Sequence, residues 1–134
     1  MGTLHLGPSA MTALMGSPAG SEERCGLLLG LPNGAVEVLP TANLATSPAD
    51  AFLIDPTALL EAAVSGRLIG CWHTHPAGPA VPSAADRRSM RQWPDLVHLV
   101  LGRTLRAWMW SSGGLIEVPV TCEETAGLLC SARP

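Results

Sequence analysis

The sequence contains no lysine, and only 14% of its 134 residues are charged. Its eight positive residues are all arginines scattered along the chain, and the formal net charge is −3. Nucleic-acid binding needs a clustered basic surface, so this distribution predicts no nucleic-acid partner. Because 47% of the residues are apolar, the low charge predicts a folded chain rather than a disordered one.

The sequence also lacks a long apolar segment and a positively charged leader, which predicts no membrane association and a cytoplasmic location. No two cysteines form a Cys-x-x-Cys pair, so the cysteines are not expected to bind zinc. We expect all four to be reduced thiols in the core rather than parts of a disulfide framework. They are Cys25, Cys71, Cys122 and Cys130.

Apolar runs alternate with helical segments along the chain, and the length fits one domain over residues 1–134. The pattern predicts helices over residues 9–16, 56–64 and 84–91. It predicts strands over residues 3–6, 25–29, 36–39, 68–73, 96–101, 106–110 and 115–120. This order of elements is typical of a mixed sheet with helices on its faces.

Two histidines mark the end of the apolar run at residues 68–73. Residues i and i+2 of a strand face the same side, so the spacing predicts that His73 and His75 point the same way. Prolines at 76, 79 and 82 then end regular pairing. Ser83 and Asp86 follow with the Ser-x-x-acid spacing of a helix start, which places Asp86 in the first helical turn.

Two imidazoles and one carboxylate match the three protein ligands of a typical hydrolytic zinc site. Taken alone, Ser-x-x-Asp is usually only a helix cap, and a single histidine at a strand end is usually structural. His5 and His98 have no partner in a motif, and we interpret both as structural. The chain is too short for a TIM-barrel hydrolase, and it lacks His-Glu-x-x-His and Pro-Cys-x-x-Cys.

The string His-Thr-His-Pro, six further residues and Ser-x-x-Asp resembles the motif of the JAMM (MPN-plus, or JAB-domain) metalloproteases, short prokaryotic type. In that family a catalytic Glu stands three residues before a Gly-Leu-Leu strand. Counting back from Gly26 selects Glu23, and the adjacent Glu22 is the alternative. The similarity extends over roughly residues 20–110.

The resemblance implies an α/β fold in which a three-layer mixed β-sheet is flanked by helices, similar to cytidine deaminases. It implies one Zn²⁺ ion per chain, held by His73, His75 and Asp86. It also implies that Glu23 is the general base and that Ser83 donates a hydrogen bond to the developing oxyanion.

For short prokaryotic members the resemblance implies peptidase action near the C-terminal Gly-Gly of a ubiquitin-like or sulfur-carrier protein, as tail processing. One alternative is an isopeptidase that removes such proteins from Lys conjugates. Another is a non-catalytic MPN-type interaction module. The run Arg87, Arg88 and Arg91 could meet an acidic partner or form a solvated helix face. The sequence leaves the oligomeric state open.

Overall fold

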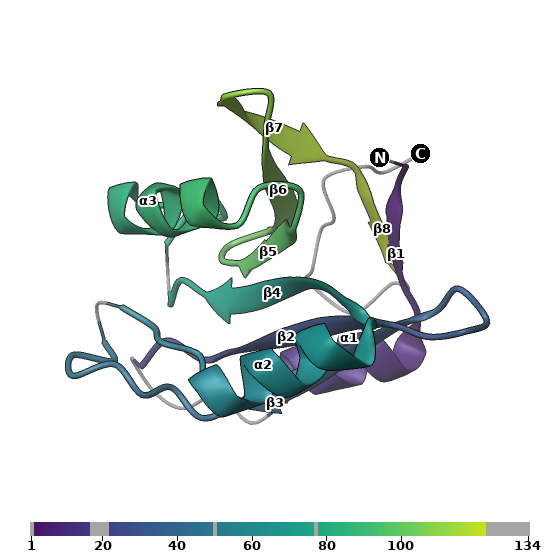
Figure 1. Ribbon diagram of the computed structural model, residues 1–134. Helices are drawn as coiled ribbons and strands as arrows, with labels where there is room; N and C mark the ends of the chain where they lie inside the picture. Colours follow the sequence, from purple (N-terminus) through teal and green to yellow (C-terminus); the bar gives the residue numbers. More distant parts are fainter. Residues whose placement is uncertain (1, 17–21, 50, 77, 123–134) are drawn as a thin grey trace.

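A six-stranded mixed sheet forms the centre of the molecule (Figure 1). The computed structural model describes residues 2–16, 22–49, 51–76 and 78–122. The helices are α1 (Pro8–Met15), α2 (Pro56–Ser65) and α3 (Ala84–Gln92). The strands are β1 (Leu4–Leu6), β2 (Cys25–Gly30), β3 (Val36–Thr41), β4 (Leu68–Thr74), β5 (Val97–Leu101), β6 (Leu105–Ser111), β7 (Gly114–Val118) and β8 (Val120–Cys122).

The strands of the central sheet lie in the order β3-β2-β4-β5-β6-β7. Within it, β4 and β5 run parallel, and the other neighbouring pairs are antiparallel. Parallel neighbours need a crossover connection, which the segment containing α3 supplies. The crossover leaves the sheet at the C-terminal end of β4, so the loop after His73 and the start of α3 lie near that end (Figure 1).

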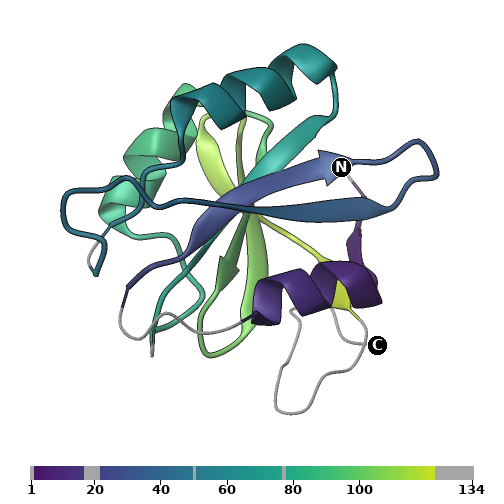
Figure 2. The same ribbon diagram turned by 90° about the horizontal axis from the view of Figure 1, so that it is seen from below.

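One face of the sheet packs against α1 and the small parallel sheet of β1 and β8, and its side chains form the main core (Figure 2). Trp72, which is 1% exposed, points into this core. A Cβ atom at Gly26 would lie 2.4 Å from Trp72 Nε1, so the close packing of these strands requires glycine there. This explains the glycine of the Gly-Leu-Leu strand.

The opposite face of the sheet is covered by α2 and α3 (Figure 2). Leu27 and Leu29 of β2 pack there against Ala62 of α2. The start of α2 is capped by the Asp55 side chain, which accepts a hydrogen bond from the backbone N–H of Thr57 at 2.9 Å. Strand alternation therefore sends Trp72 to the α1 face and its neighbour His73 to the α2 and α3 face.

The observed architecture confirms the expected three-layer α/β fold, and the three helices begin and end within one residue of their predicted bounds. The prediction of one strand over residues 115–120 is wrong. Pro119, which has no N–H to donate, separates β7 from β8, and β8 pairs with β1 in the register Leu4↔Val120. Sequence periodicity does not predict that β1 pairs with β8.

The expectation for the cysteines is correct only in part. Cys25 and Cys71 are free thiols, whereas Cys122 is disulfide-bonded, so the prediction of a reduced thiol at Cys122 is wrong. Cys130 lies outside the described residues. None of the helices in the described part of the chain has the length and hydropathy needed to cross a membrane.

Candidate metal centre

Three of the predicted site residues bring their ligand atoms to one point at the end of β4. The Nε2 atoms of His73 and His75 lie 3.0 Å apart. Asp86 Oδ2 lies 3.0 Å from His73 Nε2 and 3.2 Å from His75 Nε2. Strand alternation aligns the two rings, and the crossover into α3 brings the carboxylate to them.

These separations fit a zinc ion. Bonds of about 2.0–2.1 Å in a tetrahedron place neighbouring ligand atoms about 3.3 Å apart, close to the three distances observed. His75 can bind zinc through Nε2, because its Nδ1 lies 3.0 Å from the Pro79 carbonyl oxygen and can donate a hydrogen bond to it. With the proton on Nδ1, and with zinc in place of the Nε2 hydrogen bond to Asp86, the Nε2 lone pair would face the metal.

The start of α3 holds Asp86 in place through a complete capping box. The backbone N–H of Asp86 donates to Ser83 Oγ at 3.1 Å, and the backbone N–H of Ser83 donates to Asp86 Oδ2 at 2.9 Å. The structure thus contains the helix cap that the Ser-x-x-Asp pattern predicted, and it brings Asp86 Oδ2 close to the two imidazoles. The cap fixes the side chain that faces the imidazoles.

The electrostatics of the cluster keep Asp86 ionised. Burial alone would raise the pKa of Asp86, but hydrogen bonds from His73 and His75 outweigh it and hold the pKa well below its usual range. Burial lowers the pKa of His73, whereas the hydrogen bond to Asp86 raises that of His75. An ionised carboxylate beside neutral His73 is a donor set suited to a divalent cation.

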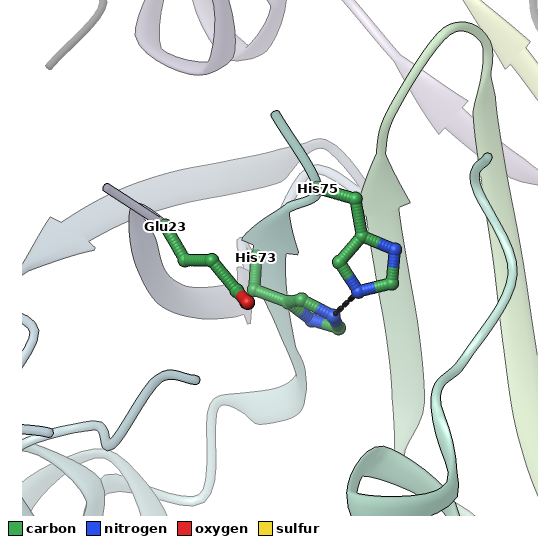
Figure 3. Close-up of side chains that lie close together, drawn as sticks. All are labelled: Glu23, His73 and His75. Carbon is green, nitrogen blue, oxygen red and sulfur yellow. Dashed lines mark hydrogen bonds between the residues drawn. The ribbon is translucent and has the colours of Figure 1, made fainter. Parts of the chain in front are cut away.

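Glu23 lies beside this cluster and is buried, with 9% of its surface exposed, whereas Glu22 is exposed. A Glu23 carboxylate oxygen and one nitrogen from each of the rings of His73 and His75 all lie within 4.8 Å of one another (Figure 3). The register of β2 on β4 pairs Cys25 with His73, which explains why Glu23 stands at this end of the sheet.

Asn43 fixes the backbone of Glu23. Its Nδ2 donates to the carbonyl oxygens of Glu23 at 2.8 Å and Ala51 at 3.0 Å. Its Oδ1 accepts from the backbone N–H groups of Ala45 and Leu53, both at 3.0 Å. One side chain therefore ties the Glu23 segment to the loop that precedes α2.

Two carboxylates could thus complete the ligand set with His73 and His75. Asp86 is at hydrogen-bond distance from both ring nitrogens. For Glu23, a carboxylate oxygen lies within 4.8 Å of one ring nitrogen of each histidine. The shorter distances favour Asp86 as the ligand and leave Glu23 to contact a water molecule at the site.

Sequence reasoning missed two groups beside the centre. The ring of Phe52 stacks on His73, with centroids 4.2 Å apart and an interplanar angle of 17°. Behind His73 on the same sheet face, Cys71 Sγ lies 3.2 Å from His98 Nδ1, and burial lowers the pKa of His98 to about 4. The i, i−2 spacing of Cys71 from His73 was an available signal, but Phe52 stood in a segment without a motif.

The remaining polar residues of the sequence analysis lie away from the centre. His5 is exposed and its Nδ1 is 2.9 Å from Thr121 Oγ1, consistent with a structural role. Arg91 lies over the ring of Trp110 at 4.9 Å, which is a packing contact on the sheet face. Arg87 and Arg88 are exposed on α3.

A three-layer α/β domain whose central strand ends in two imidazoles and a carboxylate, with a second carboxylate beside them, has the architecture of a metal-dependent hydrolase. The family model described as prokaryotic homologs of the JAB domain matches residues 14–111. The chain belongs to this prokaryotic JAB family, as its motif predicted, and is a hydrolase of that family.

Three relatives are similar over much of the chain. It is 32% identical over 111 residues to a desampylase of Pyrococcus furiosus, covering 77% of this chain and 78% of the relative. It is 33% identical over 111 residues to a desampylase of Haloferax volcanii, covering 75% of this chain and 78% of the relative. It is 41% identical over 89 residues to a probable TtuB-protein conjugate cleaving protease of Thermus thermophilus, covering 62% of this chain and 59% of the relative.

Proposed function

We propose that this protein is a zinc peptidase that hydrolyses the amide bond after the C-terminal Gly-Gly of a ubiquitin-like or sulfur-carrier protein. The observation that carries the chemistry is the convergence of His73, His75 and Asp86 within 3.2 Å of one another. The buried carboxylate of Glu23 beside them supplies a base. The relatives named for desampylation and conjugate cleavage support the substrate class.

Each side chain has a separate role in this proposal. A zinc ion bound by His73, His75 and Asp86 would acidify a water molecule and polarise the amide carbonyl. Glu23 accepts the proton of the attacking water and delivers it to the leaving nitrogen. Its burial excludes competing solvent, and Asn43 holds its backbone in place.

Ser83 stabilises the oxyanion in this proposal. Its Oγ accepts the hydrogen bond of the Asp86 backbone N–H, so its own hydroxyl hydrogen remains available to donate toward the reacting carbonyl. Ser83 is exposed at the end of the crossover loop, where a substrate can reach it. A donor fixed before reaction in this way stabilises the transition state without reorganising.

The scissile amide bond can join the carrier protein either to another protein or to a C-terminal tail, and both substrates are compatible with this chemistry. The name of the Thermus thermophilus relative, a probable TtuB-protein conjugate cleaving protease, favours a protein conjugate, in which the carrier is joined to another protein. In tail processing, the bond instead joins Gly-Gly to further residues of the same chain, which are removed. The same relatives are named for cleavage, which argues against a non-catalytic interaction module.

The test offers both substrates to one zinc-loaded preparation. One is a ubiquitin-like carrier with extra residues after Gly-Gly, and the other is the same carrier joined to a lysine side chain of a test protein. Mass spectrometry should reveal a carrier product that ends in Gly-Gly from at least one of them. If neither substrate is cut, the proposed substrate class is wrong. A preparation that binds the carrier but retains no zinc would favour the interaction module.

Replacing Ser83 should separate its two roles. Ser83→Ala should lower kcat by about a hundredfold or more and destabilise the fold by about 1 kcal/mol, because both the oxyanion donor and the helix cap are lost. Ser83→Gly should lower kcat equally but cost only a few tenths of a kcal/mol, since glycine is tolerated at an N-cap. Steady-state kinetics and urea unfolding measure the two effects. Normal kcat in Ser83→Gly would contradict the oxyanion role.

A further inference from the structure

A cavity of about 210 Å³ lies directly beside the candidate metal centre, on the sheet face that carries α2 and α3. Leu59 of α2 and Ala85 of α3 contribute to its walls, and Cys71 and His98 of β4 and β5 line it from the sheet. Asp86 also lines it. The cavity and the metal centre therefore adjoin, and a group attached to the reacting amide can enter it.

Phe52 connects the two spaces. Its ring stacks on His73 at 4.2 Å and also lines the cavity. Ser83, the proposed oxyanion donor, lines the cavity as well. If the carbonyl of the scissile bond lies at Ser83, one side chain of the substrate is long enough to reach the cavity from there.

The size of the cavity sets the size of its occupant. An apolar cavity of about 150 Å³ holds benzene. Pockets for drug-sized molecules begin at about 300 Å³. The observed volume of about 210 Å³ suits one large amino-acid side chain.

The lining selects for a neutral group. Among the described residues that line the cavity, Asp86 is the one that carries a charge, and His73, His75 and Ser83 already engage it. A negatively charged side chain would lose part of its hydration there and would lie beside the Asp86 carboxylate. Most of the other lining residues are apolar, including Phe52 and Leu59.

His98 adds one polar atom to this apolar space. The residue is 6% exposed and lines the cavity, and its Nε2 has no hydrogen-bond partner among the described residues. Its other ring nitrogen is engaged by Cys71, which fixes the ring. An unpartnered buried nitrogen is uncommon in folded proteins, and a water molecule held beside a bound apolar side chain can supply its partner.

We infer that this cavity is a specificity subsite that receives the side chain of the residue directly after the scissile bond, and that it prefers a large neutral side chain. The inference rests on the proposed function, because the two residues before the bond are then glycines without side chains. The occupant must therefore come from the leaving part of the substrate.

The experiment uses one carrier protein with three tails that differ only in the residue after Gly-Gly, which is Leu, Gly or Asp. For the zinc-loaded enzyme, kcat/KM should be about tenfold or more higher for Leu than for Gly, because each buried methylene contributes about tenfold or more to discrimination. The Asp tail should be the slowest. Filling the cavity with Ala85→Phe should remove the preference for Leu.

Ala84→Phe is the matched control, because Ala84 is the exposed neighbour on α3 and does not line the cavity. It should retain the preference for Leu, and both variants should bind zinc. Equal kcat/KM for the three tails would overturn the subsite while leaving the proposed function intact. Cleavage of the lysine-linked carrier but of no tail would also overturn it.

A binding measurement keeps the subsite testable if no carrier is cut, which would be a failure of the proposed function. Zinc-loaded Glu23→Gln is titrated with the tripeptides Gly-Gly-Leu and Gly-Gly-Gly, and the ring-proton resonance of His98 is followed by NMR. Gly-Gly-Leu should shift this resonance, and Gly-Gly-Gly should not. Adding Ala85→Phe should abolish the shift. No shift with Gly-Gly-Leu at millimolar concentration would overturn the subsite.

Discussion

Glu23→Gln should lower kcat by about a hundredfold to ten-thousandfold while the protein keeps its zinc, because a positioned general base contributes that much. Glutamine has nearly the same shape and fills the same buried space, but it cannot accept the proton of the attacking water. Zinc should remain because Asp86 Oδ2, at 3.0 and 3.2 Å from the two imidazoles, completes the ligand set without Glu23. Steady-state kinetics and elemental analysis of the purified protein give both quantities.

Glu22→Gln is the control for this prediction. Glu22 precedes Glu23 in the chain and loses the same charge on substitution, but it is exposed. Its kcat should stay within about twofold of the unmodified protein, since exposed charges interact weakly through water. Retained turnover in Glu23→Gln would refute the assignment of the base. Loss of zinc in that variant would instead make Glu23 the metal ligand in place of Asp86.

Local rules account for how the predicted ligand residues His73, His75 and Asp86 come together in the structure. Strand alternation alone places the rings of His73 and His75 on one side. The capping pattern alone places Asp86 in the first turn of α3 with its carboxylate turned back toward the chain. A crossover between parallel strands then has to return over the sheet, which brings Asp86 to the histidines.

Glu23 was found by a different kind of signal. No local rule connects it to His73, which is 50 residues further along the chain. Only the family spacing before Gly26 selected it over Glu22. The structure supplies the physical reason, because β2 pairs with β4 in a register that sets Cys25 opposite His73. Burial of Glu23 and exposure of Glu22 follow from that register and from the bonds of Asn43.

Contacts between segments that are distant along the chain could not be predicted from the sequence. The pairing of β1 with β8 joins residues more than 110 positions apart, as in Leu4↔Val120. The stacking of Phe52 on His73 depends on how the loop before α2 folds around Asn43. His98 was interpreted as a structural residue, and its position beside the cavity depends on the parallel register Cys71↔His98. Such contacts leave no periodicity in the chain.

Removing a metal ligand should abolish both zinc binding and turnover. In His75→Ala the proposed ligand set keeps two of its three members, His73 and Asp86, which is too few for a stable zinc site. Loss of a residue that merely orients a ligand costs about 10–100-fold in metal affinity, so loss of the ligand itself should cost more than about a hundredfold. Turnover should fall with zinc content, and Asp86→Asn should behave in the same way.

Thermal unfolding with and without added zinc separates metal binding from folding in these variants. A ligand that binds only the folded state at a hundred times its Kd stabilises it by about 2.7 kcal/mol, so zinc should raise the Tm of the unmodified protein. His75→Ala should still unfold cooperatively, because the main core around Trp72 lies on the other face of the sheet. Its Tm should not respond to zinc.

His5→Ala is the control for this comparison, since the His5 side chain is exposed and, within the described part of the chain, bonds to Thr121 in the small sheet. Its zinc content, its turnover and the zinc-dependent rise of its Tm should match those of the unmodified protein. A zinc-dependent rise of Tm that persists in both His75→Ala and Asp86→Asn would show that the ion binds elsewhere. The convergence of donor atoms at the end of β4 would then have to be explained by hydrogen bonding alone.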